Sequence, residues 1–222
     1  MQKVTEHHVQ EFTQAYAGKE HGERLAQRQQ QLIEAGIAQF GTLGYNATTM
    51  RMLTAAAGLS NRYFYESFDS METLLTACYR HLLGEYRQRL SQRLDTTPAG
   101  LEARLRVCVR CFFEEMRNSH FARITQVEVL GVSSQVDALY VQSLREFCGL
   151  IIDNIDNMAD FGTLSPSSMK RELEITGVAL AGAMTTAGAM WVRSRYRDSI
   201  DTVTSATVSI MLGSARQLVL KH

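Results

Sequence analysis

The stretch that decides the fold is FGTLGYNATTMRMLTAAAGLSNRYFYESFDSMETLL, residues 40–75. It predicts two short helices, over about 49–57 and 61–67, with the tight turn Gly58-Leu59-Ser60 between them. Two short helices joined by a glycine-containing turn form a helix-turn-helix. Thr48 and Ser60 stand immediately before the two helices, so their hydroxyls are the expected N-caps.

The second short helix would carry the side chains that read DNA. In a helix-turn-helix the first helix crosses the duplex backbone, and the second lies in the major groove with its N-terminal side chains at the base edges. This second helix begins Asn61-Arg62-Tyr63, three side chains that can hydrogen-bond a base or a phosphate. Phe64 and Phe68 are predicted to hold the helix against the domain core. Tyr63 and Tyr65 have two interpretations, a packed aromatic face or contact with DNA.

Helical periodicity continues on both sides of the motif. Ile33, Ile37 and Phe40 recur at i, i+4 and i+7 and predict a helix over about 24–43 that stops at Gly44. A long helix is expected from near Ser70 to about 94. Beyond Pro98 the pattern predicts five more helices, over about 99–117, 120–130, 134–158, 167–194 and 198–220. The fold class is therefore all-α, a small N-terminal helical domain joined by a long helix to a larger helical domain.

Composition supports this class. The chain has 222 residues, 45% of them hydrophobic and 21% charged, which excludes disorder as its main state and allows a substantial core. Its two prolines, Pro98 and Pro166, leave the first 97 residues without that helix breaker. The 23 basic residues, 19 Arg and 4 Lys, balance 23 acidic ones, so no global field favours a polyanionic partner.

Metal, cofactor and membrane interpretations are weak. Cys108-x-x-Cys111 has no second pair and no His at ligand spacing, and with Cys78 and Cys148 it is typical of packed, reduced thiols in a cytosolic protein. We expect no metal and no cofactor. Residues 175–192 are 18 uncharged residues, at the lower limit for a membrane span, but their glycines and alanines favour a helix packed closely on another. No signal-peptide pattern opens the chain, and a cytoplasmic location is expected.

The stretch 40–75 resembles the DNA-binding domain of the tetracycline-repressor (TetR) family of bacterial transcription regulators. The shared features, in order, are Gly44-Tyr45, Thr48, the turn Ala57-Gly58-Leu59-Ser60, Tyr65 and Phe68. The resemblance covers about 50 residues, and the remainder of the chain matches only in the number and length of its helices. Residues 1–23 are polar with only a weak apolar stripe and are expected to form a partly ordered N-terminal extension. The resemblance implies a DNA-binding domain over 24–80 and an effector-binding and dimerisation domain over 81–222.

The resemblance implies a regulator, with repression as the default, that binds a near-palindromic double-stranded DNA operator as a homodimer. It implies phosphate contacts by Thr48, Thr49, Ser60, Asn61 and Tyr65, and base contacts by Arg62 and Tyr63. Arg51 would reach either a phosphate or a base. For Arg24 and Arg28 a solvated helix face and an approach to DNA are equally open.

Three departures from the family pattern affect this picture. Arg62 stands where a small residue is common, Asn61 where Lys is frequent, and Met71 where Lys is usual. Residues 24–93 hold eight basic and five acidic residues, a net charge of only +3. Electrostatic affinity for DNA should therefore be modest, with more of the binding carried by neutral donors.

For the larger domain, the resemblance implies a pocket for a small apolar or amphipathic effector and a dimer formed by the last two long helices. Small residues from Gly177 to Ala189 support close helix packing independently. An apolar pocket is predicted from aromatic and Met residues with one polar anchor: Phe112, Phe113, Met116, His120, Phe121, Tyr140, Phe147, Met184 and Trp191. Glu128 is a second possible polar anchor, and an aromatic and Met stripe at helical spacing is more often plain core than a pocket. The chain shows no hydrolase, phosphate-loop or metalloprotease signature, so we expect no enzyme. An all-helical enzyme and a protein-interaction module without DNA binding are the alternatives.

Overall fold

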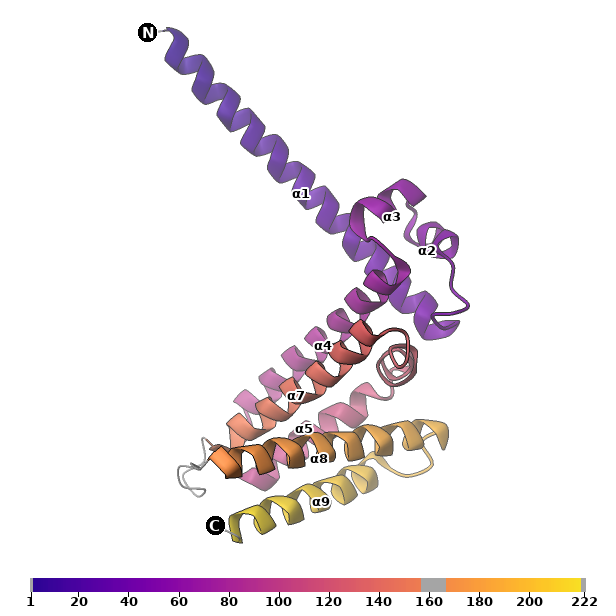
Figure 1. The fold of residues 1–222 in the computed structure, drawn as a ribbon, viewed down its shortest axis with the longest axis vertical. Coiled ribbons are helices and arrows are strands. Elements are labelled where there is room, and N and C mark those ends of the chain that lie inside the picture. Colours follow the sequence, from indigo (N-terminus) through magenta and orange to yellow (C-terminus); the bar gives the residue numbers. More distant parts are fainter. Residues whose placement is uncertain (1, 157–166, 221–222) are drawn as a thin grey trace. The chain divides into compact units, whose positions relative to one another are not determined.

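The computed structural model describes residues 2–156 and 167–220, and all regular structure in these residues is helical (Figure 1). The all-α prediction is confirmed. The helices are α1 (Gln2–Thr42), α2 (Met50–Ala57), α3 (Asn61–Ser67), α4 (Met71–Asp95), α5 (Leu101–Glu115), α6 (Ser119–Arg123), the π-helix η1 (Ile124–Glu128), α7 (Ser134–Asp156), α8 (Ser167–Arg193) and α9 (Ile200–Leu220).

The predicted start of the first helix is wrong. α1 is continuous from Gln2, so residues 2–23 are a helical extension rather than a separate, partly ordered segment. The physical reason is that nucleating a helix is the costly step, whereas extending one adds a backbone hydrogen bond for each residue fixed. Without proline, nothing in residues 2–23 stops that extension.

Two other predicted boundaries need correction. The helix expected over 120–130 is interrupted, because α6 passes into the π-helix η1 at Ile124. Thr49, not Thr48, is the N-cap of α2, since its hydroxyl accepts a hydrogen bond from the Met52 amide at 3.3 Å. The break predicted at 160–166 lies outside the described residues.

The chain divides into two compact units, residues 1–78 and 79–222, and α4 begins in the first and continues into the second. In the first unit α1 packs against α2 and α3. Gly36 allows α1 to approach the start of α4 closely, since a Cβ there would lie 2.6 Å from Sγ of Cys78. The buried side chains of this unit come from all four helices and the segment after α3, and include Leu32, Phe40, Leu53, Phe64, Phe68, Leu74 and Leu75.

In the second unit α5 packs on α9, α7 on α8, and α8 on α9. Figure 1 shows α8 and α9 running side by side. Gly188 of α8 faces Phe112 of α5, where an added Cβ would lie 2.8 Å from the ring. Trp191 packs edge-on against Phe113 and donates its indole N–H to the Asp198 carbonyl at 2.9 Å, which holds the corner between α8 and α9.

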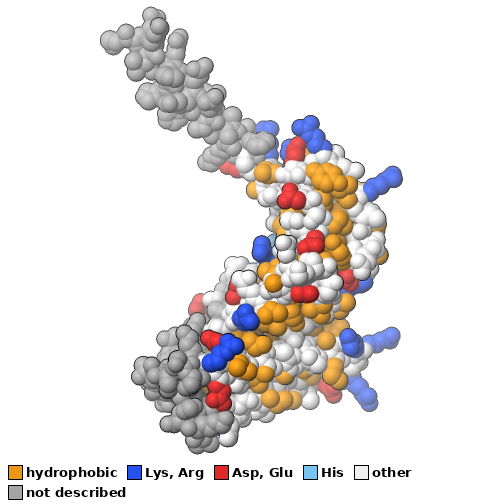
Figure 2. Space-filling model, viewed as in Figure 1, with side chains coloured by type: hydrophobic (Ala, Val, Ile, Leu, Met, Phe, Trp, Pro, Cys, Tyr) orange, Lys and Arg blue, Asp and Glu red, His pale blue; other side chains and the backbone are white. Residues whose placement is uncertain are grey.

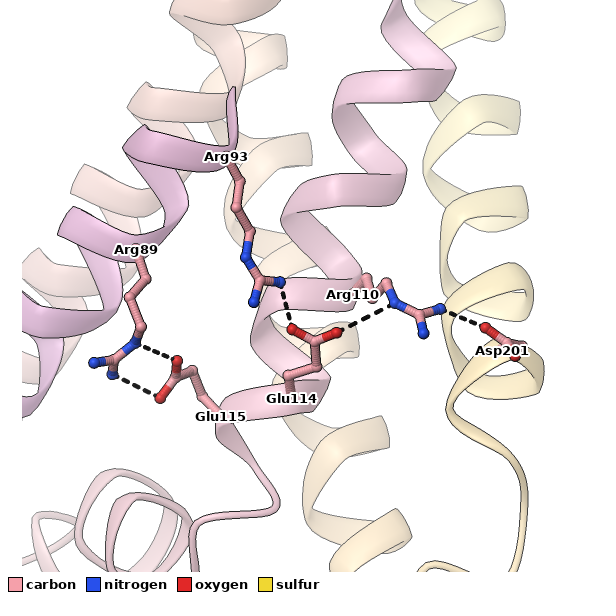
Figure 3. A network of polar contacts seen from close by, with 6 residues as sticks. All are labelled: Arg89, Arg93, Arg110, Glu114, Glu115 and Asp201. Atoms are coloured by element: carbon pink, nitrogen blue, oxygen red, sulfur yellow. Dashed lines mark hydrogen bonds and ion pairs between the residues drawn. The ribbon is translucent and has the colours of Figure 1, made fainter. Parts of the chain in front are cut away.

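Ion pairs join three helices of this unit (Figure 3). Arg89 and Arg93 of α4 bind Glu115 and Glu114 of α5. Glu114 also accepts from Arg110, whose guanidinium reaches Asp201 at the start of α9. The C-terminal half of α4 is therefore tied to α5, and α5 to α9, by charge-assisted hydrogen bonds.

Surface charge is mixed, as the balanced composition predicts. On the face drawn in Figure 2, basic and acidic side chains are interspersed among apolar ones. One helix segment, Glu174–Arg193, is long and apolar enough to cross a membrane by composition alone. It packs against α7 and α9, and Ala181, Met184 and Trp191 on its inner face are buried.

Candidate DNA-binding and ligand-binding sites

The turn between α2 and α3 is built as the sequence predicts. Gly58 ends α2 in the left-handed region, with φ of 67°, a conformation that favours glycine. The Leu59 amide then donates to the Thr54 carbonyl at 2.8 Å. The Thr54 hydroxyl in turn donates to the side-chain carbonyl of Asn61 at 3.0 Å, so a polar contact fixes the start of α3 against α2.

The residues before α2 divide into one that is buried and one that is exposed. Thr48 is 7% exposed, and its hydroxyl donates to the Gly44 carbonyl at 2.7 Å. A phosphate contact from this hydroxyl would require that bond to break. Thr49 and Arg51 are exposed on α2, as is Ser60 before α3. Ser60 is the N-cap residue of α3, as predicted, but its hydroxyl makes no capping hydrogen bond.

Helix α3 has one buried and one exposed face. Phe64 and Phe68 are buried, as predicted, and their rings pack 6.2 Å apart between centroids. Asn61, Arg62 and Tyr65 are exposed, Tyr65 to 62%. The core interpretation of Tyr65 is therefore wrong, whereas Tyr63 is half-buried. The exposed face presents polar-tipped side chains on a helix that is anchored from behind.

Glu66 forms ion pairs with two arginines beside this face. Its carboxylate accepts from Nε of Arg62 at 2.8 Å and from Nη1 of Arg28 at 3.3 Å. The Arg28 guanidinium also lies 3.8 Å from the centroid of the Tyr63 ring, a cation–π distance. Arg28 is thus held by Glu66 and Tyr63 rather than freely solvated, and its approach to DNA stays a prediction. The hydrogen bond with Glu66 raises the pKa of Arg62.

The second unit contains a cavity of about 50 Å³ bounded by α4, α5, α6, η1, α7 and α8. Its wall is mostly apolar and aromatic, with several polar groups. The lining residues are Tyr79, Leu83, Tyr86, Arg87, Phe112, Phe121, Thr125, Gln126, Tyr140, Ser143, Leu144, Phe147, Met184 and Thr185. This mixture of apolar, aromatic and a few polar side chains is the lining typical of small-molecule sites, although the cavity is smaller than most of them.

The structure brings together part of the pocket predicted from sequence. Phe112, Phe121, Tyr140, Phe147 and Met184 line the cavity. The other four predicted residues, Phe113, Met116, His120 and Trp191, do not line it. Phe113, Met116 and Trp191 are buried in the surrounding core instead.

Sequence reasoning missed the contribution of α4. Tyr79, Leu83, Tyr86 and Arg87 lie on one face of this helix and line the cavity. Their spacing of i, i+4, i+7 and i+8 is a helical stripe. Such a stripe predicts that these side chains are buried, but it cannot distinguish a fully packed core from the wall of a cavity.

Three of the lining residues, Tyr79, Tyr86 and Arg87 of α4, carry polar groups in different environments. The Tyr86 hydroxyl is buried and has no hydrogen-bond partner among the described residues, and burial holds its pKa well above the ordinary value. Tyr79 is hydrogen-bonded to Ser143, although burial still raises its pKa to about 12. Arg87, partly exposed, is paired with Glu146, which also accepts from Gln142. The cavity thus has one neutralised cation in its wall, whereas the unpartnered Tyr86 hydroxyl is fully buried and interacts electrostatically with Cys108, Cys111 and Glu115 of α5.

The four cysteines pack in the interior of the protein. All four are free and buried. Burial raises the pKa of Cys108 to about 12 and that of Cys111 to about 11, which disfavours the thiolates that a metal requires. Within the described residues, no group of three or more His, Cys, Asp or Glu side chains is placed to hold a metal ion.

Comparison with known proteins identifies the kind of domain that contains α2 and α3. Residues 32–78 match the family model of bacterial regulatory proteins of the tetR family, a span that contains the helix-turn-helix described above. This helix-turn-helix is a TetR-family DNA-binding domain. The prediction of a DNA-binding transcriptional regulator rather than an enzyme is confirmed, and family relatives support the prediction of a ligand-responsive one.

Relatives extend over both units. The chain is 26% identical over 193 residues to the transcriptional repressor KstR2 of Rhodococcus jostii, covering 83% of this chain and 89% of the relative. The fold is shared with the fatty acid degradation regulator FadR of Bacillus halodurans (TM-score 0.70, 16% identity, 84% of this chain and 95% of that one). It is also shared with FadR of Bacillus subtilis in complex with stearoyl-CoA (TM-score 0.69, 14% identity, 82% and 96%).

Proposed function

We propose that this TetR-family protein is a cytoplasmic repressor that binds a near-palindromic operator through α3 and is released by an amphipathic effector. The observation that carries the DNA-binding part is the face of α3, where Asn61, Arg62 and Tyr65 are exposed while Phe64 and Phe68 fix the helix from behind. Repression is supported by the name of the Rhodococcus jostii relative. Residues 24–80 would form the DNA-binding domain and 81–222 the effector and dimerisation domain.

A homodimer is supported by the outer faces of α8 and α9. On α8, small and apolar residues recur at helical spacing along an exposed stripe: Ile175, Ala179, Ala183, Thr186 and Met190. Ile175 is 57% exposed and Met190 64%. On α9, Ile210 is 58% exposed, and no atom lies within 4 Å of where a Gly213 Cβ would be. Two copies packed through these faces would present two α3 helices, about 34–36 Å apart on a single face of the duplex.

The effector site is the cavity of the second unit. Its aromatic wall suits an apolar chain, and Gln126, Ser143 and Thr185 in the lining are polar side chains that could hydrogen-bond a polar group on the ligand. About 50 Å³ is room for only a few water molecules, so a chain-like ligand must displace lining side chains to enter. We infer a fatty-acyl or similar amphipathic ligand, consistent with the stearoyl-CoA complex of the Bacillus subtilis protein.

Effector binding would act on the DNA-binding unit through α4. Tyr79, Leu83 and Tyr86 of α4 line the cavity, and the same helix begins at Met71 in the DNA-binding unit. The C-terminal half of α4 is held by the Arg89 and Arg93 ion pairs, so a ligand that pushes on the cavity face displaces the helix segment nearer Met71. Because coupling is reciprocal, the operator must weaken ligand binding by the same factor.

Selection of bound DNA from a random duplex pool tests the DNA-binding part. The proposal predicts enrichment of an inverted repeat, with half-sites about one helical turn apart. A separate arm adds stearoyl-CoA to the protein bound to the recovered operator. Release of the DNA by stearoyl-CoA supports the proposed effector class. If an operator is enriched but stearoyl-CoA does not release it, the fatty-acyl effector is contradicted and only the DNA-binding part of the proposal stands.

A further inference from the structure

One carboxylate on the DNA-facing helix holds two arginines. Glu66 accepts from Arg62 at 2.8 Å and from Arg28 at 3.3 Å. The Arg62 side chain is 84% exposed, whereas that of Glu66 is 35% exposed and that of Arg28 24%. Arg28 is additionally seated on the Tyr63 ring at 3.8 Å. In the absence of DNA, the guanidinium groups of Arg62 and Arg28 are therefore both hydrogen-bonded to the Glu66 carboxylate.

A carboxylate at this place affects correct and incorrect DNA differently. On any duplex it repels the phosphates and competes with them for the guanidinium groups. On the operator, Arg62 can exchange the bond to Glu66 for two bonds to guanine O6 and N7. On unrelated DNA it has only phosphates to gain, which are no better an acceptor than the carboxylate it leaves.

We propose that Glu66 is a specificity-determining residue, which holds Arg62 and Arg28 away from phosphates and so suppresses binding to unrelated DNA more than binding to the operator. This assignment rests on the proposed function, because it assumes that α3 enters the major groove. Glu66 would thus influence DNA binding although its carboxylate repels the phosphates.

The test compares wild type with Glu66→Gln on two probes, a 30-base-pair duplex of unrelated sequence and the operator recovered by selection. Fluorescence anisotropy at 50–200 mM KCl gives affinity and salt slope for each. The variant should bind the unrelated duplex about threefold to tenfold more tightly, with a salt slope steeper by about one, as expected for one more phosphate neutralised. Operator affinity should rise less, so the ratio of the two affinities falls.

Glu34→Gln is the matched control. It removes one negative charge from an exposed position of α1 in the same unit, where the carboxylate accepts from the amide of Gln30. We expect less than a twofold change on either probe. In the Arg62→Ala background, Glu66→Gln should have less than half of its effect, a readout that a purely structural role of Glu66 would not give.

Three results would overturn the assignment. Equal or weaker binding of Glu66→Gln to the unrelated duplex would show that Glu66 does not restrain the arginines. An equal gain with Glu34→Gln would show a general charge effect. If selection recovers no operator and wild type does not bind the unrelated duplex, the proposed function fails and the assignment fails with it. That outcome is distinct from wild-type binding that Glu66→Gln leaves unchanged.

Discussion

Arg89 of α4 and Glu115 of α5 form two parallel hydrogen bonds, from Nε to Oε1 at 2.6 Å and from Nη2 to Oε2 at 2.8 Å (Figure 3). The Glu115 side chain is only 13% exposed. This fork-to-fork geometry is the strongest form of an ion pair between side chains. It fixes the helix that lines the cavity to its neighbour on one side.

Arg89→Ala should lower the free energy of unfolding by about 1–2 kcal/mol, because it leaves the largely buried Glu115 carboxylate without its guanidinium partner. Urea unfolding followed by circular dichroism measures the change. Arg171→Ala is the control. The Arg171 side chain is 74% exposed, and its ion pair with Glu174 is an exposed i, i+3 pair within α8. This variant should change stability by less than about 0.5 kcal/mol. Equal effects of the two variants would contradict the role given to the Arg89 pair.

The two cavity tyrosines of α4 should respond oppositely to loss of their hydroxyls. Tyr86→Phe removes a buried, unpartnered hydroxyl and should raise the free energy of unfolding by about 1 kcal/mol. Tyr79→Phe removes the bond with Ser143 and should lower it by about 0.5–1.5 kcal/mol. Thermal and urea unfolding without ligand measure both. Destabilisation by Tyr86→Phe would show that this hydroxyl is already satisfied in the folded protein.

Stability should depend on pH through the buried thiols. Burial raises the pKa of Cys108 to about 12 in the folded protein, so above about pH 8.5, the ordinary value for cysteine, only the unfolded chain loses this proton. The contribution of Cys108 is thus complete below pH 8.5 and is lost as pH rises toward 12. Cys108→Ala should flatten the fall in free energy of unfolding between pH 9 and 10.5. Parallel pH profiles for wild type and variant would refute this assignment.

The exposed stripe of α8 should hold the dimer together. Ala183→Glu places a charge in the middle of this stripe and should shift the protein from dimer to monomer at micromolar concentration in analytical ultracentrifugation. Gln92→Glu, on an exposed position of α4, introduces the same charge elsewhere and should leave the dimer intact. A wild-type monomer would contradict the proposed homodimer, and a dimer insensitive to Ala183→Glu would place the interface elsewhere.

Much of the DNA-binding unit could be predicted from sequence because its signals are local. The left-handed Gly58 and the apolar pair Phe64 and Phe68 specify a short helix, a turn and a second short helix with little help from distant residues. The cap before α2 was misassigned because Thr48 and Thr49 are chemically alike. The choice between them depends on the bond from Thr48 to the Gly44 carbonyl, which is a contact of the folded turn.

The cavity and the role of Glu66 depend on contacts between distant segments. Periodicity marks Tyr79, Leu83 and Tyr86 as an inward face but cannot show that packing around them leaves a space. Arg28 and Glu66 lie 38 residues apart, so their pairing follows only once α1 and α3 are packed together. Sequence therefore predicts which faces are buried or exposed, and the fold decides which charges meet.

Binding of Arg62→Ala and Tyr65→Phe to single-base variants of the recovered operator tests the placement of α3 most directly. Arg62→Ala should weaken operator binding about tenfold to a hundredfold and abolish the preference at one base pair in each half-site. Tyr65→Phe should weaken all sequences about twofold to tenfold alike, because it removes only a hydroxyl directed at phosphate. Unchanged operator affinity and unchanged base preferences in both variants would contradict the account, because another helix would then occupy the groove.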